Sequence, residues 1–90
     1  MTFFQVAVRG RGLWIVVDDE AQRVEFAVTR IVDATTATDA AQLALRLVQE
    51  DRRATSAPGH SAPQLTVDAV QPTDSMPDPQ PGFRFYADPP

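Results

Sequence analysis

Residues 3–17 read FFQVAVRGRGLWIVV, and this stretch decides the fold. Apolar and other residues alternate at its start, so that Phe4, Val6 and Val8 share one side, which is the pattern of a half-buried strand. The Gly10-Arg11-Gly12 segment that follows permits the positive φ angles of a tight hairpin. The stretch therefore predicts two antiparallel strands with a turn between them.

A third strand and a helix come next. Residues 23–34 alternate again, which predicts a long strand that completes a three-strand antiparallel meander. Thr36, with Asp39 three residues later, has the chemistry of a helix N-cap, and the positive charge at Arg52 suits the end of the helix. Five apolar residues at helical spacing predict one buried helix face: Ala40, Leu43, Ala44, Leu47 and Val48.

The remaining chain predicts one more strand and an aromatic tail. Residues 64–71 alternate as a fourth strand, which would run parallel to the first or the third strand. The domain thus covers residues 1–71, with a Pro/Asp-rich extended segment over 72–82 and an aromatic tail over 83–90 that can add a short strand. The expected fold class is α+β: a β-β-β-α-β domain with its one helix packed on one face of the sheet.

Both faces of this sheet carry apolar residues, whereas one helix covers one face. The second face must be covered by the aromatic tail or by another chain, identical or different, and one hypothesis is a homodimer through this face or through a sheet edge. The candidate interface residues are Trp14, Phe3, Val16, Ile31, Phe83, Phe85 and Tyr86.

Arg30 conflicts with this pattern, because it has the same parity as the apolar residues of its strand and an unpaired buried charge is costly. A β-bulge near Thr29 would turn it outward. The functional alternative is an arginine that contacts a carboxylate or phosphate, with Arg9 and Arg11 as further candidates for an anion contact.

Composition and motifs narrow the function classes. The chain has 90 residues, a net charge of −4 and no cysteine. We expect no catalytic residue, no cofactor and no metal site, since the single histidine, His60, lies in a Pro/Ser/Gly loop. The acidity makes nucleic-acid binding unlikely. The longest apolar run, residues 13–17, is too short to span a membrane. The N-terminal residues do not have the pattern of a signal peptide, so the expected location is the cytoplasm.

Several stretches also resemble a family of small uncharacterised bacterial proteins. They are residues 26–34 (FAVTRIVDA), the helix residues Ala41, Ala44-Leu45 and Leu47-Val48, the pair Asp51-Arg52, the strand residues Leu65, Val67 and Val70, and the closing Gly82-Phe-Arg-Phe-Tyr86 element. The resemblance covers residues 3–86 and implies that the terminal aromatic residues belong to the fold. It supplies no activity and no site residues.

The sequence therefore predicts a non-enzymatic protein-interaction or accessory module, whose acidic surface would speed association with a basic partner. Two alternatives stay open. One is a small-ligand binder or enzyme whose site forms at a dimer interface, with Arg30 as the anion holder. The other is nucleic-acid binding, through basic residues near Trp14.

Overall fold

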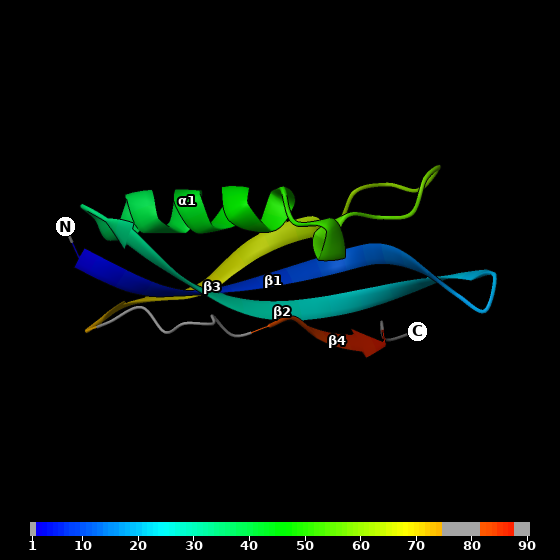
Figure 1. Ribbon diagram of the computed structural model, residues 1–90, viewed down its shortest axis with the longest axis horizontal. Helices are drawn as coiled ribbons and strands as arrows, with labels where there is room; N and C mark the ends of the chain where they lie inside the picture. The colour runs from blue at the N-terminus through cyan, green and yellow to red at the C-terminus, as the bar shows by residue number, and fades with distance from the viewer. Residues whose placement is uncertain (1, 75–81, 88–90) are drawn as a thin grey trace.

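The computed structural model describes residues 2–74 and 82–87, which form one four-stranded antiparallel sheet with a helix on one face (Figure 1). The strands lie in the order β3-β1-β2-β4. The elements are β1 (Thr2–Val17), β2 (Glu20–Ala34), α1 (Ala37–Gln49), the short 3₁₀ helix η1 (Arg52–Ala54), β3 (Gln64–Thr73) and β4 (Arg84–Ala87). The α+β class with one helix is confirmed.

The predicted hairpin at Gly10-Arg11-Gly12 is wrong, because this segment is a β-bulge inside one long strand. Gly10 pairs with Phe26 and Leu13 pairs with Val24, so two residues of β1, Arg11 and Gly12, oppose the single Glu25 of β2. Gly12 has a φ of 77°, and the chain continues in the same direction. The three-strand meander before the helix is therefore two strands.

The chain reverses at Asp18 and Asp19. Both residues have positive φ angles, 51° and 66°, and they form the two-residue connection between β1 and β2. This is the type of turn whose twist matches that of the flanking strands, and aspartate tolerates its left-handed conformation better than most residues do.

Because the chain makes one turn before the helix and not two, the strand that follows the helix also pairs differently than predicted. β3 pairs antiparallel with β1, at the edge of the sheet opposite β4. Parallel pairing with the first or third strand is thus wrong, although β3 runs in the same direction as β2. The short C-terminal strand is confirmed as β4, which pairs antiparallel with β2. Most of the 72–82 segment and residues 88–90 of the tail lie outside the described residues.

The core lies between the sheet and α1. Thr36 caps the helix as predicted, since its hydroxyl accepts a hydrogen bond of 3.1 Å from the backbone N–H of Asp39. The helix ends at Gln49 rather than near Arg52, and Leu47 is 41% exposed instead of buried. The buried helix residues are Ala40, Ala44 and Val48. They pack against the sheet residues Phe4, Val6, Val8, Leu13, Val24, Phe26, Val28 and Val32.

Position 10 requires a glycine because there is no room for a side chain, and not because of its φ angle. A Cβ atom at this position would overlap the ring of Phe26, which is fully buried directly across the strand pair. The phenyl ring thus packs against the bare backbone of Gly10, an arrangement that is found where a sheet bends.

We predict that Gly10→Ala lowers the free energy of unfolding by about 2–3 kcal/mol, because the added methyl group displaces the buried Phe26 ring. Urea denaturation followed by far-UV circular dichroism measures this. Gly82→Ala is the matched control, since no atom lies within 4 Å of its added Cβ, and it should shift the value by less than about 0.5 kcal/mol. Equal effects of the two substitutions would contradict the packing argument.

Candidate functional site

Arg30 points into the helix-covered side of the sheet. The pairing of β1 with β2 continues without a shift from Ala7–Thr29 through Val6–Arg30 to Gln5–Ile31. The bulge predicted near Thr29 is therefore wrong, and Arg30 keeps the inward parity of its neighbours. Its side chain is 11% exposed, so the charge needs partners inside the fold.

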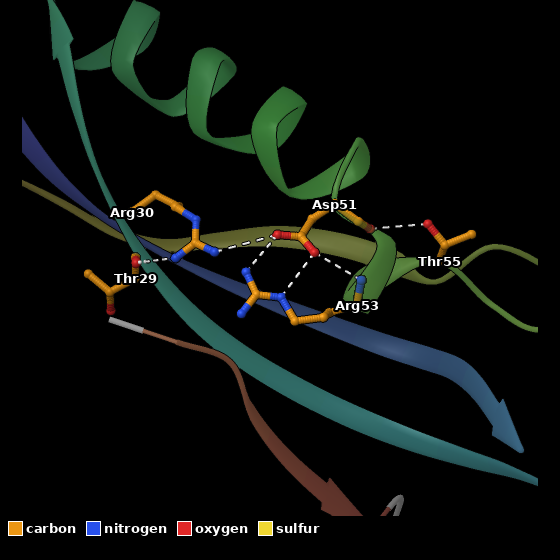
Figure 2. Close-up of polar contacts among 5 residues, drawn as sticks. All are labelled: Thr29, Arg30, Asp51, Arg53 and Thr55. Atoms are coloured by element: carbon orange, nitrogen blue, oxygen red, sulfur yellow. Dashed lines mark hydrogen bonds and ion pairs between the residues drawn. The ribbon is translucent and has the colours of Figure 1, made fainter. Parts of the chain in front are cut away.

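Those partners come from the end of the helix (Figure 2). The Arg30 guanidinium lies 3.7 Å from the Asp51 carboxylate, and it donates a 3.1 Å hydrogen bond to the backbone carbonyl of Thr29. Asp51 also accepts two hydrogen bonds from the Arg53 guanidinium, of 3.1 Å and 2.8 Å, and one of 2.9 Å from the Arg53 backbone N–H. One carboxylate thus bridges two guanidinium groups.

The electrostatics of the three groups follow from this sharing. Hydrogen bonding from Arg53 holds the pKa of Asp51 below its ordinary value, against the opposite effect of partial burial. Burial, and next the charge of Arg53, lower the pKa of Arg30, while Asp51 acts in the other direction. The hydrogen bond to Asp51 raises the pKa of Arg53. All three groups are therefore charged at neutral pH.

An aromatic ring completes the cluster. The guanidinium carbons of Arg30 and Arg53 lie 5.2 Å and 4.5 Å from the centroid of the Phe83 ring. Phe83 in turn packs on the buried Phe26, with ring centroids 5.3 Å apart. We call Arg30, Asp51, Arg53 and Phe83 the clamp, because they join β2, the segment after the helix and the residue preceding β4.

The clamp gives Arg30 a carboxylate partner, which the alternative interpretation of Arg30 as an anion contact had assigned to a ligand or partner. Asp51 is a carboxylate of the same chain, and it already takes part in a bidentate contact with Arg53. The chemistry of the clamp is thus that of an internal ionic and cation–π contact that ties the helix end to the sheet.

A second cluster lies on the sheet face opposite the helix, which we call the outer face. Trp14 pairs with Arg23 here, and its indole ring stacks on His60 with ring centroids 4.6 Å apart. The loop that carries His60 is held to the strand by hydrogen bonds from Trp14 N–H to the Ser56 hydroxyl (3.1 Å) and from Ala57 N–H to the Trp14 carbonyl (2.8 Å).

A hollow of about 580 Å³ adjoins Trp14, and we call it the Arg11 hollow. Its charged residues are Arg11, Arg23 and Glu25, and the Arg11 and Glu25 side chains lie 3.5 Å apart. The remaining lining residues are Gly12, Trp14, Ser61, Ala62 and Gln64.

The other predicted interface residues do not gather in one patch. Phe85 and Tyr86 are successive residues of β4 and so point to opposite faces. Phe85 packs near Phe26 on the helix side, with ring centroids 6.3 Å apart, as Phe83 does. Phe3 and the buried Ile31 lie on the outer face toward the other end of the hairpin from Trp14.

Trp14 and Val16 are the two predicted residues that the structure brings together on the outer face of one exposed segment. Arg9 pairs with Asp68 of β3 at 3.2 Å, in a contact where both side chains are nearly half exposed. The residue that sequence reasoning missed is Asp51. The sequence shows Asp51 only as an aspartate that can cap a short helix, which it does at η1. Its contact with Arg30 depends on how α1 packs on the sheet.

No family model, no curated protein and no solved structure matches this chain. The resemblance of residues 3–86 to small uncharacterised bacterial proteins stays a prediction. Over residues 2–74 and 82–87, no three His, Cys, Asp or Glu side chains are placed to share a metal ion. In the same part of the chain, no helix has both the length and the apolar character needed to cross a membrane.

We predict that Asp51→Asn lowers the free energy of unfolding at pH 7 by about 1–3 kcal/mol, because both arginines lose their charged partner. The effect depends on pH. Since the pKa of Asp51 is lowered by folding, its carboxylate stabilises the fold above the unfolded-state pKa of about 3.9, and this stabilisation is lost as the pH falls through the folded-state pKa.

Urea titrations of both proteins between pH 7 and pH 2.5 test this, and the difference between them should shrink below about pH 4. Glu50→Gln is the matched control, because this neighbouring acid has no ion pair among the described contacts and lies at the helix C-cap. A difference between wild type and Asp51→Asn that stays constant with pH would contradict the assigned ion pairs.

Proposed function

We propose that this chain is a non-enzymatic protein-interaction module that acts in the cytoplasm, and that it binds through residues 13–24. These residues form the distal half of the β1–β2 hairpin, and we call them the arm. The observation that carries the proposal is that the arm extends beyond the helix (Figure 1), where Val16 and Val17 are exposed apolar residues. The absence of cysteine fits a reducing compartment.

The projection of the arm follows from element lengths. α1 has 13 residues and is therefore about 20 Å long. β1 has 16 residues, and the molecule is 44 Å along its longest axis. One helix of this length covers about half of the hairpin. Leu13 and Val24 at the base of the arm are still buried, whereas its end around Val16 and Val17 lies outside the helix-covered layer.

The arm carries the apolar residues that an interaction surface requires. Val16 is 59% exposed and Val17 is 40% exposed, and these successive residues point to opposite faces of the arm. Trp14 lies next to Val16 on the outer face, and tryptophan is among the residues that contribute most to binding energy at interfaces. The exposed apolar side chains thus lie together with an aromatic residue on a segment free to meet a partner.

The charge distribution favours a protein over a nucleic acid as the partner. The arm ends in three consecutive acidic residues, Asp18, Asp19 and Glu20, all of them exposed. They lie within a few residues of the arginines near Trp14 and would repel phosphate groups. The net charge of −4 acts in the same direction.

We predict that the double substitution Val16→Thr and Val17→Thr lowers capture of a stoichiometric protein partner at least tenfold, because it removes the exposed apolar surface of the arm. Threonine keeps the β-branched shape that suits a strand. The measurement is affinity capture from a nuclease-treated native lysate, with bound proteins quantified by mass spectrometry.

Leu47→Thr is the matched control, because Leu47 is a similarly exposed apolar residue on the helix, away from the arm. It should leave capture unchanged. Equal capture by the arm variant and the wild type would overturn the proposed binding surface. A partner that disappears after nuclease treatment would instead support nucleic-acid binding.

A further inference from the structure

β4 forms one edge of the sheet, and no strand of the described chain pairs with its outward side (Figure 1). All four of its residues, Arg84–Ala87, are exposed. Two of them are aromatic: Phe85 is 46% exposed and Tyr86 is 50% exposed. An exposed edge strand with apolar side chains is a site at which a sheet pairs with another chain.

The direction of the backbone groups along this edge follows from the strands beside it. The N–H and C=O groups of Trp14 bond to Ser56 and Ala57, so they point away from β2. Arg23, which is opposite Trp14, therefore directs its own backbone groups away from β1. Because these groups alternate in direction along a strand, those of Glu25 and Ala27 point toward β4 as well.

The same alternation assigns the backbone groups of β4. Glu25 is opposite Tyr86 and Ala27 is opposite Arg84, so the N–H and C=O groups of Arg84 and Tyr86 are used in pairing with β2. The groups of Phe85 and Ala87 then point outward from the sheet. The outward side of β4 thus offers these donors and acceptors to a second strand.

The opposite edge of the sheet is protected, whereas this edge is not. β3 has an extra residue at Asp68 and a proline at position 72. A bulge and a proline both hinder pairing with another chain. β4 pairs with β2 in an unbroken register, and residues 84–87 contain no proline. β4 is therefore the edge that is suited to further pairing.

The geometry points to a second copy of this chain as the occupant: we propose that two copies pair their β4 strands antiparallel, about a two-fold axis that passes next to Phe85. The reason for a second copy is that this short strand is complementary to itself. The arrangement closes with two copies and joins their sheets into one continuous sheet. The inference goes beyond the proposed function, because it concerns a surface outside the arm.

The register places Phe85 of each copy opposite Phe85 of the other. Since the groups of Phe85 point outward, the two residues exchange both of their backbone hydrogen bonds. The Phe85 ring packs near Phe83 and Phe26 on the helix side and is still 46% exposed. A two-fold axis normal to the sheet keeps the helix sides of both copies together, so the two Phe85 rings form a cross-strand aromatic pair.

On the outer face, the same register places Arg84 of each copy opposite Tyr86 of the other. These are positions without cross-strand hydrogen bonds, where paired side chains lie closest. A guanidinium group beside a tyrosine ring makes a favourable cation–π contact, and the symmetry supplies this contact twice. Neither side chain is engaged elsewhere, since within the described part of the chain neither has an ion pair, hydrogen bond or ring contact.

The expected dimer is weak, because the new pairing is short. The prolines at positions 89 and 90 limit it to the residues before them. Such an interface is smaller than the roughly 800 Å² per partner of a standard stable complex. We expect a dissociation constant of about 100 μM, so that sedimentation equilibrium gives mostly monomers at about 10 μM and mostly dimers at about 500 μM.

Tyr86→Arg tests the contacts on the outer face, because it places two arginines opposite each other at both of them. It should raise the dissociation constant at least tenfold and leave the protein mostly monomeric at about 500 μM. Combining Tyr86→Arg with Arg84→Glu should restore the dimer, since the new arginine of each copy then meets the new glutamate of the other. Leu47→Arg is the matched control, because it adds the same charge at an exposed position of the helix.

Ala87→Pro tests the backbone hydrogen bonds. In the proposed register, the outward N–H of Ala87 donates to the carbonyl of Phe83 in the other copy. Proline removes this donor and removes none from the pairing of β4 with β2, so the dissociation constant should rise at least tenfold. Ala87→Thr keeps the N–H group and should dimerise as the wild type does.

Circular dichroism of each variant separates loss of pairing from loss of folding. A monomeric wild type at about 500 μM would overturn the proposed dimer, as would a dimer that Tyr86→Arg and Ala87→Pro both leave intact. A folded double variant that stays monomeric would overturn the register. Val16→Thr with Val17→Thr should dimerise as the wild type does, so the dimer and the binding surface of the arm are tested separately.

Discussion

The register between β1 and β2 is the constraint on which the rest of the structure depends. Before the bulge, the residues of β1 that face the helix have even numbers, such as Val6 and Val8, and after the bulge the buried residue is Leu13. A strand with regular alternation through this segment would place Leu13 on the outer face and Trp14 on the helix side of the sheet. The bulge at Arg11 and Gly12 thus keeps one continuous apolar face along a 16-residue strand.

This register explains why the sequence allowed the faces to be predicted but not the topology. The apolar residues change parity at Gly10-Arg11-Gly12, and both a hairpin and a bulge produce that change. The turn at Asp18-Asp19 was the discriminating feature, because two residues in a left-handed conformation join strands of nearly equal length. The chain reverses there, β1 lies between β2 and β3 in the sheet, and β3 pairs with it in the antiparallel direction.

Features that depend on residues close together in the sequence were predicted correctly. The Thr36 cap and the buried stripe of Ala40, Ala44 and Val48 follow from sequence spacing alone. The contact of Arg30 with Asp51 could not be predicted in this way. Asp51 follows the helix in the sequence, and no local pattern specifies the angle at which the helix packs on the sheet. The same holds for Phe83, whose position beneath Arg30 and Arg53 depends on where β4 joins the sheet.

The clamp and the arm are two consequences of covering a long hairpin with a short helix. Near the end of the helix, the inward Arg30 is accommodated by Asp51 and by the ring of Phe83. These contacts tie three segments together, and the buried layer continues past Arg30 with Val28, Phe26 and Val24. Farther along the hairpin the strands continue without a helix, and the side chains of Val16 and Val17 meet solvent. A binding surface therefore arises at the part of the sheet that the chain's own helix is too short to reach.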